Sequence, residues 1–64
     1  MQYIIRLKYR TGENRYSYVW VNSRGKGTNY KDKAHRFNDQ DNAIQVARLL
    51  TKNTKYKGEI LSVD

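Results

Sequence analysis

Apolar or aromatic residues and cations alternate between residues 5 and 10 of the chain. The odd positions carry large apolar or aromatic side chains, namely Tyr3, Ile5, Leu7 and Tyr9. The even positions from residue 6 carry cations, namely Arg6, Lys8 and Arg10. Because successive side chains of a strand point to opposite faces, this pattern predicts a β-strand with one apolar side and one basic side.

A second run with high β-propensity, residues 15–21, follows a short polar segment. That segment, residues 11–14, contains Gly12 and Asn14, which readily adopt the positive φ that tight turns need. The two runs and the turn predict an antiparallel hairpin over residues 2–22.

The next residues carry turn formers and cations without any hydrophobic period. Residues 23–33 contain two glycines and four Lys or Arg, which predicts a mobile basic loop. The Gly-Lys-Gly sequence at 25–27 lacks the spacing of a phosphate-binding P-loop, so it predicts no nucleotide site by itself. Residues 34–37 fit a short extra strand.

A helix is predicted over residues 39–52. Asn38 is suited to cap its first turn, and Asp41 is placed to act as the reciprocal partner in a capping box. The apolar positions that recur with helical spacing are Ala43, Val46, Ala47 and Leu50. Asn53 can adopt the left-handed conformation that ends a helix.

Residues 56–63 predict a closing strand, although Ile60, Leu61 and Val63 do not alternate cleanly. The chain of 64 residues has room for one domain. The predicted architecture is therefore α+β, a two-layer ββ(β)αβ domain in which one helix packs on one face of an antiparallel sheet of three to four strands.

The positive charge is concentrated in one half of the sequence. The net charge is +7, and residues 1–36 carry nine Lys or Arg against two acids, whereas the remaining residues are neutral overall. Such an excess is typical of proteins that bind a polyanion, most often nucleic acid. Rows of Lys or Arg can also serve solubility or protect an edge strand.

One helix can cover only one face of the predicted sheet, so the other face meets solvent or a partner. Burying Arg6, Lys8 and Arg10 without partners would be too costly. The apolar side of the first strand therefore belongs under the helix, and the cations lie on the helix-free face.

The face taken by the second strand depends on the length of the turn. With a two- or four-residue turn, Tyr16, Tyr18 and Trp20 join the core, and Arg15 and Ser17 extend the exposed face. With a three-residue turn and a left-handed Asn14, Leu7 pairs with Val19, and the same three aromatic residues stand beside the cations. The second geometry would be a stacking platform for unpaired bases. The sequence leaves both open.

The composition argues against catalysis. His35 is the only histidine, there is no cysteine, and the acids are scattered, so no metal site, cofactor or acid–base pair is predicted. No apolar run approaches the roughly 20 residues of a membrane span, and no signal peptide is evident at Met1. We expect a cytoplasmic protein that is not an enzyme and does not bind membranes.

The run Lys33-Ala34-His35-Arg36-Phe37, followed by a capped helix with alanines at 43 and 47, resembles a pattern in small phage and prophage proteins. Those proteins also begin with a hairpin that opens with Tyr and two hydrophobic residues. The resemblance implies action on DNA, or inhibition of a host defence nuclease or of transcription. The order of elements is also similar in topology to the three-stranded DNA-binding domains of phage integrases.

We therefore expect a small basic accessory protein of a mobile element that binds DNA or RNA through the helix-free face and the basic loop. The alternative is a phage-borne inhibitor or adaptor that docks on a host protein or ribonucleoprotein complex, as anti-CRISPR proteins do. The residues expected to contact nucleic acid are Arg6, Lys8, Arg10, Arg15, Tyr16, Tyr18, Trp20, Arg24, Lys26, Lys31 and Lys33.

Overall fold

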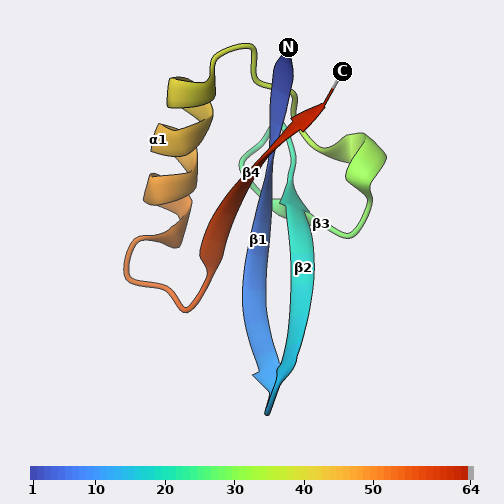
Figure 1. The fold of residues 1–64 in the computed structure, drawn as a ribbon, viewed down its shortest axis with the longest axis vertical. Helices are drawn as coiled ribbons and strands as arrows, with labels where there is room; N and C mark the ends of the chain where they lie inside the picture. Colours follow the sequence, from blue (N-terminus) through green and yellow to red (C-terminus); the bar gives the residue numbers. More distant parts are fainter. Residues whose placement is uncertain (64) are drawn as a thin grey trace.

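A four-stranded antiparallel sheet and one helix form the domain, in a computed structural model that describes residues 1–63. The elements in chain order are β1 (Gln2–Gly12), β2 (Arg15–Val21), β3 (Gly27–Thr28), the 3-10 turn η1 (Lys31–Lys33), α1 (Gln40–Thr51) and β4 (Lys57–Val63). The strand order is β3-β2-β1-β4, and α1 packs on β4 and β1 (Figure 1). The predicted α+β architecture is confirmed.

The turn between β1 and β2 sets the face of every β2 residue. Asn14 has a φ of 57°, in the left-handed region, and the register shifts by one residue between Arg10 and Gly12. As a result Leu7 pairs with Val19, and Arg10 pairs with Tyr16. This is the second of the two geometries that the sequence left open, and it turns the β2 aromatic residues away from the core.

The core lies between α1 and one face of the sheet. Its buried residues are Ile5, Leu7, Val21, Phe37, Ala43 and Ala47. The helix approaches the sheet closely because small residues meet at the contact: a Cβ added at Gly58 would lie 3.1 Å from the Cβ of Ala47. Val19 and Ile60 pack against the same cluster, which fixes the core side of β2 and β4.

The start of α1 differs from the prediction by one residue. The N-cap is Asp39, whose carboxylate accepts a hydrogen bond from the backbone N–H of Asp41 at 3.1 Å. Asn38 was expected to cap the helix, but its side chain instead accepts a hydrogen bond from Gln2 at 3.0 Å. The helix ends at Thr51, and Asn53 has a φ of 60°, as expected for a left-handed stop.

The short third strand lies elsewhere than predicted. Residues 34–37 form no strand, and only a single bridge joins Phe37 to Tyr3. The pairing partner of β2 is β3, inside the segment predicted as an irregular loop. The reason is local: the Asn22 side chain accepts hydrogen bonds from the backbone N–H groups of Arg24 and Lys26, so the chain reverses directly after β2.

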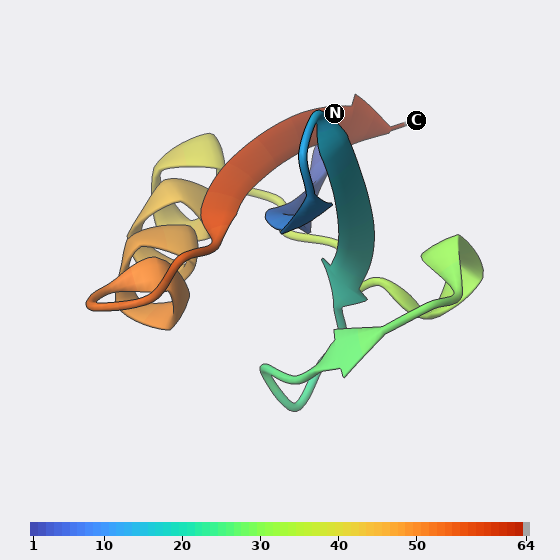
Figure 2. The same cartoon turned by 90° about the horizontal axis from the view of Figure 1, so that it is seen from below.

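The helix-free face is exposed to solvent only along part of its length. Ile4 lies on this face and is 3% exposed, beside Ala34, Arg36 and Val63. Figure 2 shows η1 and β3 displaced to the β2 side of the sheet, opposite α1. The expectation of a face that is bare throughout was therefore wrong near the N-terminus of β1, and the exposed part lies toward the hairpin.

The left-handed residue gives a prediction for stability. Replacing Asn14 by Ala should lower the free energy of unfolding by about 1–2 kcal/mol, because a Cβ without a compensating polar group disfavours positive φ, whereas Asn14→Gly should retain it. Urea unfolding measures both. Glu13→Ala, at the exposed neighbouring turn position, is the control, and equal stability of Asn14→Ala and the wild type would contradict the role of Asn14.

Candidate nucleic-acid interface

The β-pairing gathers cations and aromatic residues on one surface, which we call the open face. Its members on β1, β2 and β4 are Arg6, Lys8, Arg10, Tyr16, Tyr18, Trp20, Lys57 and Glu59. Across β1 and β2, Arg6 is opposite Trp20, Lys8 is opposite Tyr18, and Arg10 is opposite Tyr16. Across β1 and β4, Arg6 is opposite Glu59 and Lys8 is opposite Lys57. Because strand side chains alternate, all of these residues lie on the side away from α1.

The two tyrosines of the open face are accessible. Tyr16 is 50% exposed and Tyr18 is 42% exposed, whereas Trp20 is half-buried. The difference follows from the sheet order, because β3 pairs only with Trp20 and Val21. Beside Tyr16 and Tyr18 the outer edge of β2 has no neighbouring strand among residues 1–63, so these rings keep one side open.

The aromatic rings of the open face also contact cations. The Lys8 ammonium lies 4.3 Å from the ring centroid of Tyr16, and the Arg6 guanidinium carbon lies 4.3 Å from that of Tyr18. Trp20 lies between Arg6, at 5.7 Å, and Lys31, at 5.6 Å. These are cation–π distances, and such contacts orient the rings before any ligand arrives.

Arg6 differs from the other cations of the open face because a carboxylate neutralises it. Its guanidinium contacts Glu59 Oε1 at 2.9 Å through both Nε and Nη2. The two side chains are 28% and 37% exposed, so the pair contributes at most about 1 kcal/mol of stability. It is the one ion pair within residues 1–63. Arg6 is therefore a weaker candidate for a phosphate contact than Lys8, Arg10 and Lys57, which form no ion pair within residues 1–63.

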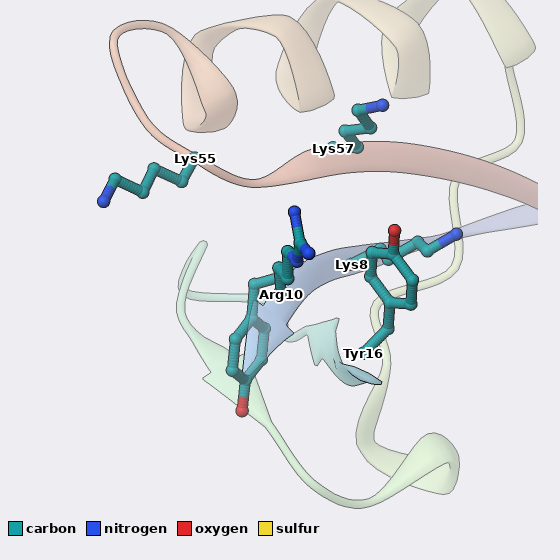
Figure 3. Close-up of a pocket in the computed structure, with 6 residues that line it drawn as sticks. Lys8, Arg10, Tyr16, Lys55 and Lys57 are labelled. Carbon is teal, nitrogen blue, oxygen red and sulfur yellow. The ribbon is translucent and has the colours of Figure 1, made fainter. Parts of the chain in front are cut away.

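A concave site, which we call the notch, lies at the end of the open face nearest the β1–β2 turn. It has a volume of about 240 Å³ and is lined by Lys8, Tyr9, Arg10, Tyr16, Lys55 and Lys57. It arises because β4 begins at Lys57, opposite Lys8, while β1 continues to Gly12. Figure 3 shows Arg10 pointing toward the strip between β1 and β4, and the ammonium groups of Lys55 and Lys57 pointing apart.

Lys55 and Lys57 were not among the predicted contact residues, since the second half of the sequence is electrically neutral. The signal that could have found them is the pairing of the closing strand with the first strand. An antiparallel pair with Ile5 opposite Ile60 puts Lys57 opposite Lys8. In that register the core side chains of the two strands lie opposite each other. The sequence did not reveal it, because apolar and polar residues do not alternate regularly over residues 60–63.

Not all of the other residues predicted to contact nucleic acid lie on the open face. By strand alternation Arg15 shares the face of Ser17 and Val19, opposite to Tyr16. Arg24 and Lys26 lie in the exposed turn between β2 and β3. Of the loop cations, Lys31 reaches Trp20, and Lys33 lies 5.8 Å from the ring centroid of Tyr30.

His35 packs edge-on against Phe37, with ring centroids 4.6 Å apart, and its backbone N–H donates to the carbonyl of Val21. No group of three His, Cys, Asp or Glu side chains suited to a metal gathers within residues 1–63. In the same range, no helix has the length and apolar character to cross a bilayer.

Comparison with protein-family models, curated proteins and solved structures found no match for this chain. The resemblance to small phage and prophage proteins stays a prediction.

Proposed function

We propose that this protein binds single-stranded nucleic acid across the open face. The observation that carries the proposal is the register of β1 and β2, which puts Tyr16, Tyr18 and Trp20 on the same surface as the cations of β1. Exposed aromatic rings beside cations are the combination that binds unpaired bases and their phosphates together.

Stacking favours a single strand over a duplex. The bases of a duplex are stacked on each other, and only their edges are accessible in the grooves, whereas an unpaired base can lie flat on an aromatic ring. Tyr16 and Tyr18 each have one open side next to the unpaired edge of β2. Two stacked bases would supply about 1–3 kcal/mol each.

Phosphate contacts supply the rest of the affinity. Lys8, Arg10 and Lys57 adjoin the rings and form no ion pair within the described chain, and Lys31 extends the basic surface past Trp20. Cation–π contacts alone could serve to stabilise the sheet. They would not require two tyrosines to stay about half exposed on the same surface, which is what favours a ligand.

The first test is a titration of an unstructured oligonucleotide, as DNA and as RNA, followed by fluorescence anisotropy and by Trp20 emission. We expect a Kd on the order of 1–100 μM at low salt, and a slope of log K against log salt of about −3, for about four phosphates neutralised on a single strand. A hairpin duplex of equal length should bind more weakly. Absence of binding to either single strand at low salt would refute the proposed function.

The second test separates the rings from the charges. Tyr16→Leu with Tyr18→Leu should weaken binding by roughly tenfold or more, because the loss of stacking exceeds the loss of apolar area. The salt slope should not change. Tyr16→Phe with Tyr18→Phe keeps the rings and should bind like the wild type.

Tyr30→Leu removes another exposed tyrosine that lies outside the open face and serves as the matched control. If the double Leu variant binds as tightly as Tyr30→Leu, stacking on β2 is not the mode of binding.

The third test concerns Glu59, the one acid on the open face. Glu59→Gln releases Arg6 and removes a negative charge, so affinity for single strands should rise roughly two- to fivefold at low salt. The slope should steepen by about 0.7, for one more phosphate contact. Asp41→Asn makes the same change in net charge at the start of α1. Equal effects of the two substitutions would show that only net charge matters.

A role in a mobile element, and the alternative of an inhibitor that docks on a host complex, stay predictions of the sequence. A host partner that is captured stoichiometrically after nuclease treatment would favour the inhibitor.

A further inference from the structure

We infer that the notch binds the terminal phosphomonoester of the strand whose bases stack on Tyr16 and Tyr18. This inference rests on the proposed function and adds to it a preference for strands that end in a phosphate. The notch is built from Lys8, Arg10, Lys55 and Lys57, with Tyr16 on its border.

No carboxylate within residues 1–63 forms an ion pair with the cations of the notch. The notch contains four cations, and the one ion pair within residues 1–63 joins Arg6 to Glu59 outside it. Lys8 and Lys57 are directly opposite each other in neighbouring strands, an arrangement that destabilises a sheet. The Tyr16 ring accepts the Lys8 ammonium on one side, which relieves only part of this repulsion. An anion between the strands would relieve the rest.

The notch is large enough for a phosphate group and small for an organic ligand. Its volume of about 240 Å³ is below the roughly 300 Å³ at which pockets for small organic ligands begin. It is open on the hairpin side, because residues 9–12 of β1 have no β4 partner. The backbone along that edge offers further polar groups to a ligand.

The charge of a terminal phosphate matches four cations better than an internal one does. A phosphodiester carries one negative charge, whereas a phosphomonoester carries about 1.5 to 2 near neutral pH. The position agrees as well. Tyr16 is the last ring of the row toward the hairpin, so a strand lying along the rings reaches the notch where the row ends.

The loop that carries Lys55 is held in place by an aromatic contact. Tyr56 packs edge-on against Tyr9, with ring centroids 5.4 Å apart and an angle of 77° between the rings. This contact connects the backbone on the two sides of the notch, β1 at Tyr9 and the segment before β4 at Tyr56. Figure 3 shows the ammonium groups of Lys55 and Lys57 pointing in different directions, so a bound phosphate requires these side chains to rotate toward it.

The test compares three versions of one oligonucleotide, labelled internally so that both ends are free. One version has a 5′-phosphate, one has a 3′-phosphate, and one has hydroxyl groups at both ends. We expect one of the phosphorylated strands to bind the wild-type protein about tenfold more tightly than the hydroxyl-ended strand, the gain of one well-formed charged contact. The preferred end gives the direction in which the strand lies.

Lys55→Gln with Lys57→Gln should abolish this preference, and Lys55→Arg with Lys57→Arg should keep it. Arg48→Gln with Lys52→Gln removes the same number of charges from the end of α1 and should also keep it. Titration of labelled protein with inorganic phosphate, followed by NMR, should shift the amide signals of residues 9–12 and 55–57.

The outcomes distinguish failure of the terminal-phosphate site from failure of the proposed function. If all three strands bind the wild-type protein equally, the terminal-phosphate site is refuted while the proposed function stands. If the preference survives Lys55→Gln with Lys57→Gln, the phosphate binds elsewhere and the inference is refuted. If none of the strands binds, the inference and the proposed function both fail.

Discussion

One backbone conformation, the left-handed Asn14, determines what the helix-free surface consists of. It adds one residue to the turn, so β2 pairs with β1 in the register that sends Val19 and Val21 into the core and the aromatic residues outward. A turn one residue shorter would exchange the two faces of β2. The cations of β1 would then have no rings beside them, and neither the stacking surface nor the border of the notch would exist.

The fold could be predicted where the hydrophobic pattern admits only one solution. Cations at Arg6, Lys8 and Arg10 exclude that side of β1 from the core, and the apolar stripe of α1 has no alternative partner. The face of β2 was undecidable because both of its sides are good core candidates: Val19 and Val21 on one, Tyr16, Tyr18 and Trp20 on the other. Only the turn distinguishes them, and Asn tolerates both conformations.

The local errors have a common origin in hydrogen bonds made by polar side chains. Asn22 closes a tight turn that creates β3 where the composition indicated an irregular loop. Asp39 takes the capping position because Asn38 is engaged by Gln2, a residue 36 positions away in the sequence. Sequence patterns indicate which residues can cap a helix or form a turn. Tertiary contacts decide which of two neighbouring candidates does so.

Charge along the sequence is a poor guide to charge in space for this chain. The second half is neutral as a sequence, yet its acids and cations separate in the fold. Asp39 and Asp41 lie at the start of α1, which is at the end of the molecule opposite the β1–β2 turn (Figure 1). Glu59 forms an ion pair with Arg6. Lys55 and Lys57 remain beside Lys8 and Arg10. Like charges in neighbouring strands destabilise a sheet, so repulsion among these four cations lowers the stability of a domain that has only about 3–5 kcal/mol to lose. An anion that binds there stabilises the folded state by relieving that repulsion, which couples occupancy of the notch to the stability of the whole sheet.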